Sequence, residues 1–223
     1  MKSRSNAFTL VELLVVMGMM VSIMIILIGM FKGARGSFEY GNSRIGMQQR
    51  AREAIKRVTV LVVSGIDSGA TPERAIHVPA ADGASDNQLV FCTTEDVLVP
   101  ESSNPANRSK LWNPVTQPQP PIFRYRIRYD NAQRRLVLER GTPGQDLLTP
   151  AAFLPDPNTP SRILADSDSD RGGARLTGVT FTRQRANAVR VSVQFQGTVR
   201  SASGVERDIT YDLDSVVQLP AVQ

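Results

Sequence analysis

The sequence predicts an α+β protein in which a long N-terminal helix packs on a mostly antiparallel β-sheet head. Three observations lead to this class: a long apolar run at the N-terminus, a helical amphipathic pattern after it, and alternating apolar and polar residues in much of the remainder. The chain has 223 residues, enough for one domain with an appendage but too few for two full-sized domains. Its hydrophobic content of 41% can supply a buried core.

The N-terminal run, from Phe8 to Phe31, contains a single ionisable side chain, Glu12. As a helix it would extend about 36 Å at 1.5 Å per residue, and the hydrocarbon core of a bilayer is roughly 30 Å thick. The run is longer than the apolar core of a secretory signal peptide, and no good small-residue cleavage site follows it. We therefore expect one transmembrane helix. A carboxylate inside such a helix is costly and marks either a functional contact or a side chain that reaches the headgroups.

A second helical pattern follows, with apolar residues recurring at intervals of three and four and basic residues between them. The apolar stripe consists of Ala51, Ala54, Ile55, Val58, Leu61 and Val62. It should pack on a sheet, and the basic residues should form a solvated face. Five glycines separate the two patterns and predict a break or flexible stretch, because each weakens a helix by roughly 1 kcal/mol relative to alanine. These glycines are Gly29, Gly33, Gly36, Gly41 and Gly46.

The remainder predicts strands. Residues Ile122 to Tyr129 alternate strictly, and Arg135 to Glu139 follow a turn-rich connection, so these two segments should form a hairpin. Further strands are predicted at Gln88 to Cys92, Leu176 to Arg183, Val189 to Phe195 and Val205 to Leu213. The proline-rich stretches 101–121 and 142–160 should be long loops at the edge of the sheet.

Composition excludes several kinds of site. One cysteine and one histidine, Cys92 and His77, exclude an intrachain disulfide and the usual structural zinc sites. Cys92 follows Val90 and Phe91 and is expected in the core, whereas His77 lies near Pro79 in a predicted loop with no evident partner. No catalytic set emerges and no cofactor is implied, so an enzyme is not expected. The alternative is a membrane-anchored hydrolase whose carboxylates converge in the fold.

Two charged groups could bind ligands. Asp166, Asp168 and Asp170 alternate like a calcium-binding loop, but Arg171 and Thr177 occupy positions that need glycine and glutamate. A solvated acidic loop without metal is therefore predicted, with calcium as the alternative.

Arg124, Arg126 and Arg128 share one face of the predicted strand, and Tyr125 points to the other. Because nucleic-acid binding combines stacking with charge, a solvent-exposed arginine row is predicted instead. The formal net charge of +5 is scattered along the chain and indicates little about nucleic acid.

The stretch Ala7-Phe8-Thr9-Leu10-Val11-Glu12-Leu13-Leu14, after a short basic leader, resembles the processing site of type IV prepilins and of type II secretion pseudopilins. The match covers about 30 residues. Leader length, small residue, phenylalanine, glutamate spacing and apolar run all agree. Ala7 departs from the glycine most often found there, but alanine is the mildest replacement, so cleavage is still expected.

The resemblance implies that a prepilin peptidase cuts between Ala7 and Phe8 on the cytoplasmic side and that the new amino group of Phe8 is methylated. This amine is cationic at neutral pH and can meet the Glu12 carboxylate of a neighbouring subunit. Unit charges 4 Å apart attract by about 4 kcal/mol at an effective dielectric constant of 20, before the cost of desolvation. The implied partners are the peptidase, other pilin or pseudopilin subunits, the inner-membrane assembly platform and the membrane.

The order of elements in the head is also similar to that of W-type minor pilins and J-type minor pseudopilins. The supporting stretches are Leu89 to Cys92, the Tyr125 to Leu138 hairpin, Arg162 to Asp166 before a strand, and Ala188 to Phe195. The implied layout is a leader at 1–7, a membrane segment at 8–31, an amphipathic continuation at 32–64 and a β-rich head at 65–223.

The implied function is that of a minor pilin or pseudopilin that assembles into or primes a filament. It would sit in the inner membrane with its N-terminus in the cytoplasm and its head in the periplasm or outside. The alternative is a competence pilin that binds DNA through Arg124 to Arg128, although nucleic acid is not the expected partner.

Overall fold

The computed structural model describes residues 9–66, 76–93, 97–98, 122–142, 153–167, 174–200 and 205–219. These residues form two compact units. One consists of Met1–Asn42 with Val199–Arg207, and the other of Ser43–Thr198 with Asp208–Gln223. The second unit contains both β-sheets except for strand residues 199–200 and 206–207, and it is called the head below.

One helix, α1 (Leu10–Val63), contributes its first part to one unit and its last part to the head. It runs through all five glycines without interruption, so the predicted break is absent. A side chain built at Gly29, Gly33, Gly41 or Gly46 would meet nothing within 4 Å, so close packing does not explain these glycines. Helix propagation adds one hydrogen bond for each residue ordered, so a long helix can continue through residues of low intrinsic helix propensity. An ion pair between Arg35 and Glu39, one turn apart, adds to this support.

Two antiparallel sheets make up the β structure of the described residues, where one sheet was predicted. The first has the order β1-β4-β5-β6-β7, with β2 also paired to β4. Its strands are β1 (Gly65–Ile66), β2 (Ile76–Val78), β4 (Gln88–Thr93), β5 (Phe123–Asp130), β6 (Arg135–Arg140) and β7 (Arg162–Ala165). The second sheet has the order β10-β9-β8-β3. Its strands are β3 (Ser85–Asp86), β8 (Arg175–Arg185), β9 (Ala188–Arg200) and β10 (Glu206–Gln218).

The predicted strands are confirmed within one or two residues at most of their ends, although β9 and β10 each continue five residues beyond their predicted ends. The β5–β6 hairpin is also confirmed, with Tyr129 opposite Leu136 and Asp130 opposite Arg135. The Asp130 carboxylate accepts hydrogen bonds from the backbone N–H groups of Ala132 and Gln133 at 3.1 and 3.2 Å, which is the local bonding that favours aspartate at turns. The Arg162 to Asp166 stretch, expected to precede a strand, itself contains β7.

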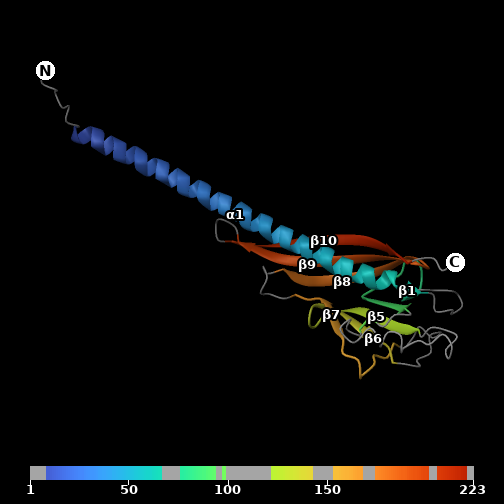
Figure 1. The fold of residues 1–223 in the computed structure, drawn as a ribbon. Helices are drawn as coiled ribbons and strands as arrows, with labels where there is room; N and C mark the ends of the chain where they lie inside the picture. Colours follow the sequence, from blue (N-terminus) through green and yellow to red (C-terminus); the bar gives the residue numbers. More distant parts are fainter. Residues whose placement is uncertain are drawn as a thin grey trace, which may run out of the picture. The chain divides into compact units, whose positions relative to one another are not determined.

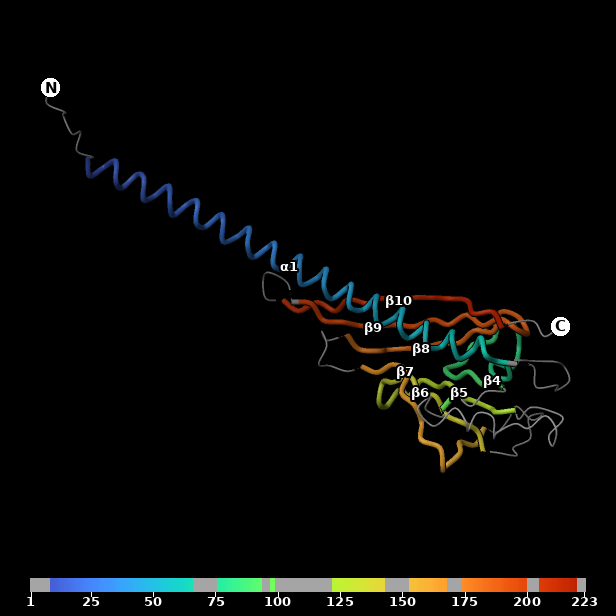
Figure 2. Tube along the Cα trace, viewed as in Figure 1, coloured from blue at the N-terminus to red at the C-terminus, as the bar shows by residue number. Residues whose placement is uncertain are grey.

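The head has one hydrophobic core, to which α1 and both sheets contribute. The predicted amphipathic stripe of α1 is the part that faces this core, and Met47 extends it toward the N-terminus. Figures 1 and 2 show the last part of α1 lying along β8, β9 and β10. The phenolic O–H of Tyr129 on β5 donates a 3.1 Å hydrogen bond to the carbonyl oxygen of Leu176 on β8, which joins the two sheets inside the core. Burial raises the pKa of this Tyr129 hydroxyl.

Backbone hydrogen bonds hold the 153–160 segment beside the end of β6, where Asp156 N–H donates to the Arg140 carbonyl oxygen at 2.8 Å. An isolated antiparallel bridge joins Gly141 to Pro155, and Thr142 N–H donates to the Leu154 carbonyl oxygen at 3.0 Å. Two parts of the predicted loops lie outside the described residues. They are residues 143–152 of the 142–160 loop and the whole of the 101–121 loop.

The packing of α1 on the sheets predicts that Ile55→Ala lowers the free energy of unfolding by about 2–5 kcal/mol. Ile55 is 7% exposed in the core, whereas Ile45 on the same helix is 53% exposed. The matched variant Ile45→Ala should change stability by less than about 0.5 kcal/mol. Urea unfolding of the full chain in detergent measures both, and equal effects of the two variants would contradict the packing described here.

Candidate functional site

The described chain begins at a pair of mutually bonded side chains, Thr9 and Glu12. Glu12 Oε2 accepts hydrogen bonds from the backbone N–H and the hydroxyl of Thr9, both at 3.0 Å. In return, the Glu12 backbone N–H donates to Thr9 Oγ1 at 3.3 Å. This reciprocal arrangement is a capping box, which satisfies N–H groups that the first helical turn leaves without intrahelical partners.

The sequence contains the signature of this motif, a threonine followed three residues later by glutamate before an apolar run. Glu12 was predicted to serve in assembly or to contact the headgroups, and its role in capping was not predicted although this signature was present. The capping bonds use Oε2, and Glu12 Oε1 accepts no hydrogen bond from any described residue. One carboxylate oxygen is therefore open to a donor from another molecule.

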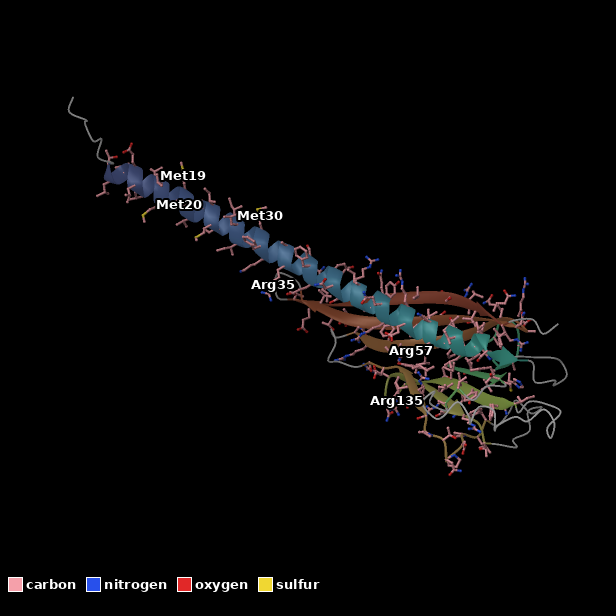
Figure 3. The ribbon with its side chains drawn as sticks, viewed as in Figure 1. Met19, Met20, Met30, Arg35, Arg57 and Arg135 are labelled. Carbon is pink, nitrogen blue, oxygen red and sulfur yellow. The ribbon has the colours of Figure 1, made fainter. Side chains whose placement is uncertain are left out.

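The helix around Glu12 has an apolar surface that the chain itself leaves uncovered. From Leu10 to Phe31 the large apolar side chains are between 46% and 81% exposed. Met19, Met20 and Met30 project outward from the helix in Figure 3. By length and composition, this part of α1 can cross a membrane. The predicted cleavage and methylation positions, Ala7 and Phe8, lie outside the described residues.

The arginine row of β5 differs from its prediction. Arg124 is 3% exposed, so the expected solvent-exposed face is wrong at this position. The guanidinium groups of Arg126 and Arg128 both bind the Glu139 carboxylate on β6, at 2.6 and 2.9 Å, where Glu139 lies opposite Arg126 in register. Two of the three arginines on β5 therefore share a counterion on the next strand.

An aromatic ring also covers this face, which was predicted to carry charge without stacking. The guanidinium carbon of Arg126 lies 4.6 Å from the centre of the Phe153 ring, and that of Arg124 lies 5.9 Å from it. Such contacts favour a cation over the face of the ring. Tyr125 faces the core, as predicted. Because Glu139 pairs with both Arg126 and Arg128, Asp130 lies 3.8 Å from Arg128, and Arg124 is buried, the row offers little free positive charge to a phosphate backbone.

The single cysteine and the single histidine lie together on the same sheet. Cys92 on β4 is buried, as predicted. His77 is wrongly predicted as a loop residue without a partner: it belongs to β2, is 6% exposed, and its Nε2 lies 3.6 Å from Cys92 Sγ. β2 pairs with β4, so the pairing of the strands brings the two side chains together. Both are too buried to meet a substrate.

Asp166 lies beside a shallow cleft of about 180 Å³ between α1 and β7. Arg50 donates to the carbonyl oxygen of Ala174 at 2.9 Å, and Arg57 donates to that of Leu164 at 2.7 Å. These two bonds attach α1 to both sides of the 166–173 segment. Arg57, labelled in Figure 3, also forms an ion pair with Glu53, so the charges in the cleft are largely balanced.

Asp168 and Asp170 lie outside the described residues, so their part in the calcium alternative stays a prediction. Within the described parts of the chain, no group of three or more histidine, cysteine, aspartate or glutamate side chains is placed to hold a metal ion.

Comparison with known proteins gives no match: no family model, no curated protein and no solved structure is significantly similar to the chain. The candidate site therefore depends on the start of α1, where one carboxylate lies in an apolar helix and keeps a free oxygen.

The capping box predicts that Thr9→Ala loosens the first turn of α1 by about 1 kcal/mol, because the hydroxyl and its two hydrogen bonds are lost. Thr9→Ser keeps the hydroxyl and should behave like the unchanged chain. Hydrogen exchange of the amides of residues 10–13, measured for the full chain in micelles, reports the difference. Equal protection in both variants would show that Thr9 does not cap the helix.

Proposed function

We propose that this chain is a minor pilin or pseudopilin, a single-pass membrane subunit that is trimmed between Ala7 and Phe8 and then joins or primes a type IV pilus or a type II secretion pseudopilus. The observation that carries the proposal is a lone carboxylate, Glu12, in the first turn of an otherwise apolar and uncovered helix. The resemblance of residues 7–14 to a prepilin processing site supports it. A long helix that packs its last part on antiparallel sheets is compatible with the layout of such subunits.

In this proposal, removal of the leader changes the charge at the start of the chain. Before cleavage the Phe8 nitrogen is a neutral amide, and afterwards it is a cationic amine. An unpaired Glu12 in an apolar filament core is penalised, whereas a Glu12 that meets this cation is tolerated. Only processed subunits would therefore pack at the correct register.

The capping box is compatible with this role. Thr9 occupies Glu12 Oε2, and Oε1 remains available to accept a hydrogen bond from the amine of a neighbouring subunit. A carboxylate can accept several donors at once, so capping within one chain and pairing between chains can coexist. Thr9 would also hold the Glu12 side chain beside the N-terminal end of its helix.

No specific observation favours the DNA-binding alternative, since Arg126 and Arg128 are paired with Glu139, Arg128 also lies near Asp130, and Arg124 is buried. The proposal likewise assigns no catalytic role to the cleft at Arg50 and Arg57, whose guanidinium groups are bound to backbone carbonyl oxygens.

Mass spectrometry of the membrane-extracted protein should find a mature chain that begins at Phe8 and carries one methyl group on its amine. Deletion of the prepilin peptidase should leave the chain starting at Met1. A wild-type chain that begins at Met1, or beyond the apolar run, would overturn the proposal.

Glu12→Gln should leave membrane insertion unchanged and reduce incorporation into filaments by at least tenfold. Glutamine still serves as the partner of threonine in a capping box, so this variant removes the charge and keeps the cap. The matched control is Glu39→Gln, which neutralises an exposed glutamate on the same helix outside the apolar run and should assemble normally. Immunoblots of sheared filament fractions measure incorporation, and normal incorporation of Glu12→Gln would count against the pairing.

A further inference from the structure

The exposed side of α1 in the head carries a short row with two charges and one apolar residue. Arg52, Lys56 and Val60 are spaced four residues apart, and all three are exposed, Val60 by 64%. The side chains of Arg52 and Lys56 have no hydrogen-bond or ion-pair partner among the described residues. Beside them, Glu53 and Arg57 form an ion pair and contribute no net charge. We call Arg52, Lys56 and Val60 the helix row.

A second row lies on β10, which has β9 as its one neighbour in the sheet order. Asp212, Asp214 and Val216 alternate along this strand and are exposed, Val216 by 57%. Neither aspartate side chain has a hydrogen-bond or ion-pair partner within the parts of the chain that the structure describes. We call these three residues the strand row.

The two rows point in opposite directions within one molecule. α1 packs on the inner side of the second sheet, where a side chain built at Gly197 would come within 3.2 Å of Met47 Sδ. The alternate residues of β10, Ile209, Tyr211 and Leu213, pack against the same core. The strand row therefore lies on the outer side of the sheet, and the helix row lies on the side of α1 that faces away from the sheet. A contact between the rows requires two molecules.

The rows match in spacing as well as in charge. Four residues of an α-helix advance about 6 Å, and two residues of a β-strand advance about 6.7 Å. When the rows are aligned in chain order, Arg52 meets Asp212, Lys56 meets Asp214 and Val60 meets Val216. Both charged pairs are attractive, and the exposed valines cover each other at the same end.

We propose that the helix row of one copy docks on the strand row of a second copy. The contact joins two different surfaces, so repetition produces an open helical array or a ring rather than a closed twofold dimer. It goes beyond the proposed function, because it involves neither Glu12 nor the processed N-terminus. The charged pairs are exposed and should weaken as salt concentration rises.

Disulfide cross-linking of full-length chains tests this geometry. Two chains of different mass, one carrying Val60→Cys and the other Val216→Cys, are co-expressed and oxidised in membranes. The expected product is a mixed disulfide dimer, with little product from either variant alone. Val60→Cys paired with Thr180→Cys is the matched control, because Thr180 is exposed on β8 of the same sheet, away from the strand row. The native Cys92 is buried and stays in all chains.

Charge reversal provides the second test. R52E/K56E in the Val60→Cys chain should lower the mixed product at least tenfold, and D212K/D214K in the Val216→Cys chain should restore it. Restoration also shows that both variants fold. Three results would overturn the proposal. These are the absence of the mixed disulfide dimer, an equal amount of dimer from the Val60→Cys chain alone, and a yield of mixed dimer that neither charge reversal changes. An unchanged yield would mean that Asp212 and Asp214 serve only to prevent edge-to-edge pairing of β10 with another strand.

The test is separate from that of the proposed function. Cross-linking in detergent-solubilised chains should persist with Glu12→Gln and without cleavage at Ala7. Loss of processing with retained cross-linking would therefore contradict the pilin assignment alone. Normal processing without cross-linking would contradict the docking of the two rows alone.

Discussion

The rest of the structure depends on one continuous helix, α1, which is exposed and apolar in its first part and packed on the β-sheets in its last part. The large apolar side chains from Leu10 to Phe31 are exposed and are not covered by the described residues, and this part of α1 is long and apolar enough to cross a membrane. From Met47 to Val62 the same helix has a single buried stripe and packs on the sheets. A continuous helix is the element that can do both, because it satisfies its backbone hydrogen bonds internally wherever it lies.

Glu12 is the exception in the apolar part, and its geometry explains how it can be kept there. One oxygen closes the helix start through Thr9, which provides a local reason for an acidic residue at this position. The other oxygen accepts nothing from the described chain. The proposed pairing with a neighbouring subunit would use this second oxygen, so it would not compete with capping.

In the head, most buried or half-buried charges are used internally. Glu139 binds Arg126 and Arg128, and Arg183 on β8, 3% exposed, forms an ion pair with Asp82 at 2.9 Å. Guanidinium groups are suited to forming buried ion pairs because they donate hydrogen bonds to several acceptors in fixed directions. Among the exposed charges that have no partner in the described residues are Arg52 and Lys56 on α1 and Asp212 and Asp214 on β10, and these two pairs have opposite signs. The proposed docking of the helix row on the strand row therefore depends on these few residues and not on the net charge.

Local pattern predicted the strands well, because alternation in β5 and β9 and the Asp130 turn act over a few residues. The capping box was equally readable, from Thr9 and Glu12 three positions apart. The glycine break was wrong, because a sum of propensities cannot weigh the cooperativity of a long helix. Alternation also shows which side chains share a face but not whether that face is covered, so the burial of Arg124 and its contact with Phe153 could not be foreseen.

The amino-acid sequence by itself determined where the membrane-competent helix lies, which stripe of it meets the core and which segments pair as strands, since these follow from hydrophobic periodicity over short distances. Tertiary structure alone decided that the strands divide into two sheets, that His77 meets Cys92, and that the helix and strand rows lie on opposite sides of the head. These arrangements depend on contacts between residues far apart in the chain, and their free energy comes from packing that no local pattern encodes.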